Sequence, residues 1–181
     1  VVQGVLIEYF TNLGFEILEH SIFKSRTLLV KGHVKVNIIH NQSITQVFSE
    51  ITSRLKPWLS KSKYQEIRAS SLGKKSNLRP DHIVHLSDAE DEVVLLVEDK
   101  CMMEESKSFR DSILDLLGYF HDVDATSLAS AGHNFYGLGV GFSSEISRPF
   151  ELLHDIGYTS LNNIKDALDV IISPHLKKLL S

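Results

Sequence analysis

An almost unbroken apolar run that ends in three charged residues constrains this chain more than any other feature. Residues 93–97 read Val-Val-Leu-Leu-Val, and Glu98, Asp99 and Lys100 follow directly. Such a run is typical of a central strand that is buried on both faces of a sheet. Because side chains alternate along a strand, Glu98 and Lys100 share one face and Asp99 lies on the other. The sequence therefore predicts that two ionisable side chains meet on one face at the end of a buried strand.

A second strand is expected immediately before this one. Residues 81–86 have a strand-like pattern, and the polar link 87–92 reads Ser-Asp-Ala-Glu-Asp-Glu, which is typical of a turn. The two strands form a hairpin, and the hairpin returns Asp81 to the neighbourhood of Glu98. We therefore expect two carboxylates and the Lys100 ammonium to converge.

Charged groups at the end of a buried strand need a partner, because an unpaired charge in a place of low dielectric constant costs several kcal/mol. A divalent cation offsets that cost for Asp81 and Glu98. Carboxylate oxygens suit Mg²⁺ or Mn²⁺, which keep several waters and bind the phosphate oxygens of a substrate. Lys100 would then lie beside the attacking water or a phosphoryl oxygen and stabilise the developing negative charge.

The charge distribution along the chain is uneven. The net charge of −4 argues weakly against nucleic-acid binding, but residues 51–80 contain eight basic residues and one acid. Residues 81–124 contain thirteen acids and three basic residues. A basic block beside an acidic block suggests one surface for phosphates and one cluster for cations. The alternative is a solvated charged face on each side.

Apolar periodicity predicts the remaining elements. Helices are expected over 1–14, 43–59, 108–123, 150–156 and 162–172, with a last short helix capped by Ser173 and begun by Pro174. Extended segments are expected over 15–22, 27–39, 64–70 and 134–142. The core stripe of helix 108–123 is expected to be Phe109, Ile113, Leu116, Leu117 and Phe120. Gly137, Gly139 and Gly141 are expected to permit close packing in their strand rather than to form a dinucleotide site.

The motifs and their element order resemble the PD-(D/E)xK nuclease superfamily, the restriction-endonuclease-like proteins. Pro80-Asp81 and Glu98-Asp99-Lys100 carry the resemblance, which covers residues 43–142. It implies an α/β fold with an α-β-β-β-α-β core, in which helices flank a central mixed sheet. The chain is then a single nuclease-like domain, with an N-terminal elaboration (1–42), a catalytic core (43–142) and a C-terminal helical part (143–181).

The resemblance implies a metal-dependent endonuclease that hydrolyses phosphodiester bonds in DNA, which we favour over RNA. Asp81 and Glu98 would bind Mg²⁺ or Mn²⁺, the backbone carbonyl of Asp99 would add a ligand, and Lys100 would be catalytic. The rival interpretation is a catalytically inactive nuclease-like module that binds nucleic acid or a protein partner. The intact set of Asp81, Glu98 and Lys100 speaks against that rival, because a binding module has no need of all three.

Members of this family often place a further glutamate on the helix before the first core strand. Glu50 has that position at the border of an apolar stripe and is a candidate metal ligand, with a surface glutamate on an amphipathic helix as the alternative. Glu66, in the next expected strand, competes for the same role.

Some branches carry Gln-x-x-x-Tyr on the helix after Glu-x-Lys, where this chain has Asp115 and Tyr119. The i, i+4 spacing puts both residues on one flank of the helix. The resemblance implies that they contact the metal site or a nucleic-acid backbone, with Tyr119 as a nucleic-acid-binding candidate. The alternative is a plain structural role, which is the more common one because helix flanks commonly carry such residues.

A basic loop over 73–79 runs directly into Asp81. Lys74, Lys75 and Arg79 are therefore the candidates for phosphate contacts, which favour affinity over sequence reading. A charged loop without such a role is the alternative.

The remaining sequence features concern zinc binding, the cellular compartment and further domains. His82 and His85 are three apart on a strand and face opposite sides, so they do not form a zinc pair. Cys101 is the single cysteine, which is compatible with a reducing compartment, so we expect an intracellular protein in cytoplasm or nucleus. No apolar run approaches a membrane span. The chain begins at Val1 rather than Met, which leaves room for further domains in a longer parent chain.

Overall fold

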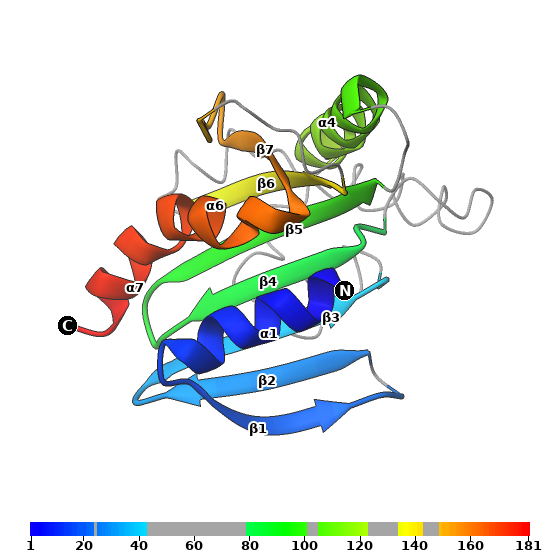
Figure 1. Cartoon of the computed structure of the whole chain (residues 1–181). Helices are drawn as coiled ribbons and strands as arrows, with labels where there is room; N and C mark the ends of the chain where they lie inside the picture. The colour runs from blue at the N-terminus through cyan, green and yellow to red at the C-terminus, as the bar shows by residue number, and fades with distance from the viewer. Residues whose placement is uncertain (24, 43–78, 101–104, 123–133, 143–148) are drawn as a thin grey trace.

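The computed structural model describes residues 1–23, 25–42, 79–100, 105–122, 134–142 and 149–181 (Figure 1). In this part of the chain the protein is an α/β structure with a seven-stranded mixed open sheet and four α-helices. None of the helices described is long and apolar enough to cross a membrane. The expected helix 43–59 and strand 64–70, together with Glu50, Glu66, Lys74 and Lys75, lie outside the described residues.

The strands follow one another across the sheet in the order of the sequence. They are β1 (Glu16–Ser21), β2 (Arg26–Lys31), β3 (Val34–His40), β4 (His82–Ser87), β5 (Glu92–Lys100), β6 (Asn134–Gly141) and β7 (Ile156–Ser160). Each neighbouring pair from β1 to β5 is antiparallel, whereas β5, β6 and β7 are parallel. Parallel neighbours need a crossover, and helix α4 (Glu105–Asp122) lies between β5 and β6 in the chain.

Helices cover both faces of the sheet. Helices α1 (Val2–Asn12), α6 (Ile164–Ile171) and α7 (Ser173–Leu179) lie on the face turned to the viewer in Figure 1. Leu6 and Phe10 of α1 and Leu168 of α6 share one buried cluster with Val84 of β4 and Leu95 of β5. Helix α4 packs on the other face, against β5 and β6. The central strands are thus buried on both sides, as the apolar run of β5 predicts.

Residues 1–42, expected as an addition to the core, supply α1 and three strands of this same sheet. The expected extended stretch 27–39 is divided into β2 and β3 by a turn at Gly32, which has a φ of 58°. Glycine adopts this left-handed conformation at little cost, so the turn fits its sequence.

The expected helix over 150–156 is wrong. The chain there makes a turn and then enters β7, which runs parallel to β6. His154 and Asp155 have φ values of 52° and 65°, a left-handed backbone that a helix cannot contain. The helix expected over 162–172 is confirmed as α6, which follows the short 3₁₀ helix η2 (Leu161–Asn163).

The last short helix, α7, is also confirmed, with Pro174 in its first turn. Its cap differs from the prediction. Ser173 is the first helical residue, and Ile172 occupies the N-cap position.

The expected core stripe of α4 is confirmed in part. Leu116 is fully buried and Ile113 and Phe120 are partly buried, whereas Phe109 and Leu117 are 45% and 50% exposed. Among the α4 side chains whose burial the structure describes, those of Ser108, Ser112, Leu116 and Tyr119 are buried. Small serines face the sheet because the facing residues of β6 are glycines, so the helix backbone approaches the strand closely. The prediction that these glycines permit close packing is confirmed.

This close approach predicts that Gly139→Ala destabilises the fold. A Cβ at position 139 would lie 3.0 Å from Cβ of Ser112 and 3.1 Å from Cδ2 of Tyr158, closer than ordinary contact. We expect a loss of about 1–3 kcal/mol in the free energy of unfolding, measured by urea denaturation. Gly118→Ala on the exposed side of α4 is the matched control, since a Cβ there meets nothing within 4 Å. It should raise stability by about 0.5–1 kcal/mol, and a similar loss in both variants would contradict the packing account.

Candidate active site

The hairpin of β4 and β5 positions the three residues predicted to carry the chemistry. Both strands are confirmed to within one residue of their expected bounds. Their register pairs His82 with Val97, so Asp81, directly before β4, comes opposite Glu98 near the end of β5. The backbone N–H of Asp99 donates a hydrogen bond of 2.7 Å to Oδ2 of Asp81. The Asp81 carboxylate is thereby held against the Glu98–Lys100 segment.

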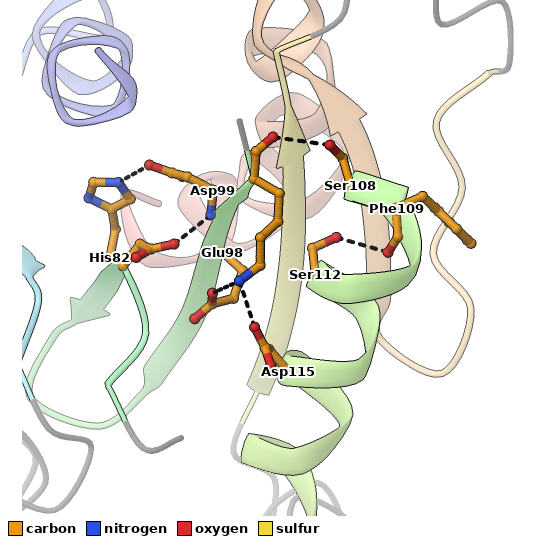
Figure 2. Close-up of polar contacts among 9 residues, drawn as sticks. His82, Glu98, Asp99, Ser108, Phe109, Ser112 and Asp115 are labelled. Carbon is orange, nitrogen blue, oxygen red and sulfur yellow. Dashed lines mark hydrogen bonds and ion pairs between the residues drawn. The ribbon is translucent and has the colours of Figure 1, made fainter. Parts of the chain in front are cut away.

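Alternation along β5 separates the side chains as expected. Oε2 of Glu98 lies 3.6 Å from Nζ of Lys100, so these two share a face. The Asp99 side chain lies on the other face, where its Oδ2 accepts a hydrogen bond of 2.8 Å from Nε2 of His82. Figure 2 shows this division, with the His82–Asp99 contact on one side of β5 and Asp115 on the other.

Helix α4 contributes two side chains to the Glu98 face. Oδ2 of Asp115 lies 2.7 Å from Nζ of Lys100, and the Tyr119 hydroxyl is hydrogen-bonded to Glu98. Asp115 and Tyr119, expected on one flank of this helix, thus both reach the predicted site. Tyr119 is 2% exposed, so its hydroxyl lies in the interior of the site. Burial and the charge of Glu98 raise the pKa of Tyr119, so the hydroxyl keeps its proton and donates a hydrogen bond to Glu98.

Glu98 is the most strongly perturbed acid of the site. Burial, and then the neighbouring charge of Asp81, raise its pKa to about 8, although the Tyr119 hydrogen bond and Lys100 oppose the shift. Its side chain is buried, and Oε1 has no hydrogen-bond partner in the part of the chain described. Without a cation, this carboxyl therefore keeps its proton at neutral pH.

Lys100 stays charged. Burial alone lowers its pKa, but the hydrogen bond and charge of Asp115, followed by the charges of Glu98 and Asp81, raise it above the ordinary value. The hydroxyl of Ser108 in α4 also donates a hydrogen bond of 3.3 Å to the backbone carbonyl of Lys100. Lys100 is thus held at its ammonium by Asp115 and at its backbone carbonyl by Ser108.

The donor set fits a hard divalent cation in part. Asp81 and Glu98 supply carboxylate oxygens, and the partnerless Oε1 of Glu98 is an unused acceptor. Among the residues described, no three His, Cys, Asp or Glu side chains lie close enough together to hold a metal ion. Mg²⁺ and Mn²⁺ bind through one or two carboxylates and keep several waters, so two carboxylates suit them without a closed protein cage.

The remaining predicted residues fall around this centre. Arg79 is exposed and lies two residues before Asp81. His82 and His85 face opposite sides of β4, as predicted, since His82 contacts Asp99 and His85 contacts Glu92. Sequence reasoning missed His40 of β3, whose Nδ1 lies 2.7 Å from Nδ1 of His82. No local pattern marks that pair, because it depends on the register between β3 and β4.

The fold and the site together define an α/β protein whose central hairpin carries a cluster of ionisable side chains at one end. No family model, curated protein or solved structure matches this chain.

Proposed function

We propose that this protein is a metal-dependent nuclease of the PD-(D/E)xK type, which hydrolyses phosphodiester bonds in DNA. The observation that carries the proposal is the state of Glu98. This carboxyl is buried, has a pKa of about 8 and an oxygen without a partner in the described residues, and lies beside Asp81 and Lys100. Burial of an ionisable carboxyl costs free energy, and a bound cation or substrate would compensate for that cost.

Asp81 and Glu98 would hold Mg²⁺ or Mn²⁺, with the backbone carbonyl of Asp99 and the side chain of Glu50 as further proposed ligands. The cation would supply charge neutralisation at the phosphodiester and a lower pKa for the attacking water. Hydrolysis forms a bond between the water oxygen and phosphorus and breaks the bond to the leaving sugar oxygen, which takes up a proton. Attack by water needs no 2′-hydroxyl, so DNA suffices as the substrate and RNA is the alternative.

The other residues of the site would stabilise charge, position the reacting groups and contact the phosphates. The Lys100 ammonium would orient the water and stabilise negative charge on the phosphoryl oxygens. Asp115 holds Nζ of Lys100 in place and keeps it protonated. The Tyr119 hydroxyl orients the Glu98 carboxyl. Lys74, Lys75 and Arg79 would contact the phosphate backbone on the approach to Asp81.

A second candidate function is binding of nucleic acid or of a protein partner without cleavage. The observation that favours it is the lack of a three-ligand metal cluster among the residues described. In that case the Lys100–Asp115 ion pair would be a structural contact of α4 with β5.

A cleavage assay separates the two candidates. Plasmid DNA and single-stranded RNA are incubated with the protein in Mg²⁺, in Mn²⁺ and in EDTA. We expect cleavage in the metal buffers, none in EDTA, and a loss of at least 100-fold in Asp81→Asn. Asp166→Asn, an exposed acid on α6, should cleave like wild type. If no substrate is cut while nucleic acid is bound equally with and without metal, binding without cleavage is the correct function.

Substitutions in the basic loop (73–79) are expected to change the affinity for DNA and its salt dependence. Changing Lys74 and Lys75 together to glutamate should weaken DNA binding and make the negative slope of log K against log salt shallower by about 2, since each lost phosphate contact removes about 0.9. Binding is measured by fluorescence anisotropy across a salt series. The matched control changes Lys177 and Lys178 of α7, which are both exposed, to glutamate. If both double variants weaken binding equally, the loss is due to net charge, and the basic loop makes no specific contact with DNA.

A further inference from the structure

A chain of three polar side chains lies on the face of β5 opposite to Glu98. Asp99 of β5 accepts a hydrogen bond from His82 of β4 at 2.8 Å, and Nδ1 of His82 lies 2.7 Å from Nδ1 of His40 on β3. The His40 and His82 rings also pack edge to face, with centroids 5.0 Å apart. The chain therefore runs across three adjacent strands and ends on the residue between Glu98 and Lys100.

Each ring nitrogen of His82 has its own partner among these side chains. Nε2 of His82 contacts Oδ2 of Asp99, and its Nδ1 faces Nδ1 of His40. Burial, and then the neighbouring His82, lower the pKa of His40 to about 4, so His40 is neutral near pH 7. A neutral imidazole has one donor and one acceptor nitrogen, so His40 can donate or accept at the Nδ1–Nδ1 contact. Both ring nitrogens of His82 are then engaged, and its ring is held in one orientation.

Asp99 connects the two histidines to the candidate active site. Its backbone N–H donates to Asp81, and its side chain accepts from His82, so one residue is held from both directions. Oδ1 of Asp99 is buried and has no hydrogen-bond partner in the described residues. The Asp99 side chain is 23% exposed, so loss of His82 would remove the hydrogen bond that holds this carboxylate and let it turn toward water. That rotation would move the backbone between Glu98 and Lys100.

We propose that His82, oriented by His40, is a positioning residue for the site, because it fixes the Asp99 backbone and thereby the placement of Asp81 against Glu98. Neither histidine touches the substrate in this role. The catalytic consequence rests on the proposed nuclease function, whereas the structural consequence does not.

The same hairpin provides a matched control. His85 of β4 donates to or accepts from Glu92 of β5 at 3.1 Å, which is again a buried histidine–carboxylate contact between the two strands. This pair lies on the other face and at the far end of the hairpin from Asp81. Its loss should destabilise the fold at least as much, because both side chains are more deeply buried than His82 and Asp99.

The test compares His82→Leu, His82→Gln and His85→Leu in the full chain without metal. The hydrogen-exchange rate of the Asp99 amide is measured by NMR, relative to the Leu95 amide in the middle of β5. We expect His82→Leu to speed this exchange at least tenfold, and His82→Gln, which keeps a donor near the Nε2 position, to restore most of the protection. His85→Leu should leave the ratio unchanged. An unchanged ratio in His82→Leu, or an equal rise in His85→Leu, would overturn the proposal.

Cleavage provides the second measurement. We expect His82→Leu to lower kcat about 10-fold with KM unchanged, and His85→Leu to retain wild-type kcat. If wild type cleaves no nucleic acid, the nuclease proposal fails, and the exchange measurement still decides the positioning role. If His82→Leu does not fold, Asp99→Ser removes the same contact and keeps the amide, so the same comparison is made with that variant.

Discussion

Replacing Lys100 with methionine is expected to lower the kcat of nucleic-acid cleavage by about 10²–10³-fold, the loss typical for removal of one group that stabilises transition-state charge. The reason is that Lys100 carries the ammonium at this face of β5, and Asp115 holds its Nζ at 2.7 Å. Methionine keeps most of the apolar stem. The Asp115 carboxylate that loses its partner is 43% exposed and is solvated by water, so the fold should survive. Cleavage is measured at saturating DNA and Mn²⁺.

Lys107→Met is the control for this substitution, because it makes the same change at an exposed position of α4. It should retain kcat to within about threefold. If Lys100→Met also retains kcat to that extent, while its thermal unfolding matches wild type, Lys100 has no role in catalysis and the proposed division of work is wrong.

Replacing Glu98 with glutamine is expected to stabilise the metal-free protein above about pH 5. Glu98 has a pKa of about 8 in the folded state and an ordinary value of 4.5 in the unfolded chain. Below pH 4.5 both states hold the proton and the carboxyl has no effect. Between pH 4.5 and 8 the unfolded chain releases the proton and the folded protein keeps it, so wild-type stability falls as pH rises. Glutamine does not titrate, so the advantage of Glu98→Gln grows to roughly 3 kcal/mol at pH 7.

The measurement is urea denaturation of both proteins from pH 4 to pH 9 in EDTA. Glu90→Gln, in the exposed turn of the hairpin, is the control and should run parallel to wild type. Addition of Mn²⁺ should raise the stability of wild type but not of Glu98→Gln, since a ligand of the folded state stabilises only a protein that binds it. Parallel pH curves for wild type and Glu98→Gln would contradict the burial of an ionisable Glu98.

The hairpin and the division of side chains on β5 were predictable because both follow from local pattern. Five aliphatic residues mark a strand buried on both faces, and the period of two then separates Glu98 and Lys100 from Asp99. The six-residue polar link predicts the turn. These features need no knowledge of what packs on the sheet.

Other features depend on contacts between distant parts of the chain. The apolar residues of α4 suggest a core stripe through Phe109 and Leu117, yet the helix turns Ser108 and Ser112 to the sheet because β6 presents glycines there. Strand β7 was missed because the apolar residues before it have a helical spacing. The left-handed backbone at His154 and Asp155, which ends any helix there, leaves no mark in the sequence.

In the candidate site, too, some contacts follow from local sequence pattern and others depend on distant parts of the chain. The convergence of Asp81, Glu98 and Lys100 follows from the hairpin alone. The contacts of Asp115 and Tyr119 require the helix to be rotated toward β5, and periodicity alone had favoured a plain structural role for both residues. The His40–His82 contact requires the pairing of β3 with β4 across 42 residues of sequence. Register over such a distance is set by the assembled sheet.

Anomalous scattering from crystals soaked in Mn²⁺ tests most directly whether Asp81 and Glu98 form a divalent-cation site. We predict one anomalous peak within about 2.5 Å of a carboxylate oxygen of each residue, present in wild type and absent in Asp81→Asn crystals soaked in the same way. A wild-type crystal with both carboxylates ordered, full exposure to Mn²⁺ and no peak between them would contradict the claim.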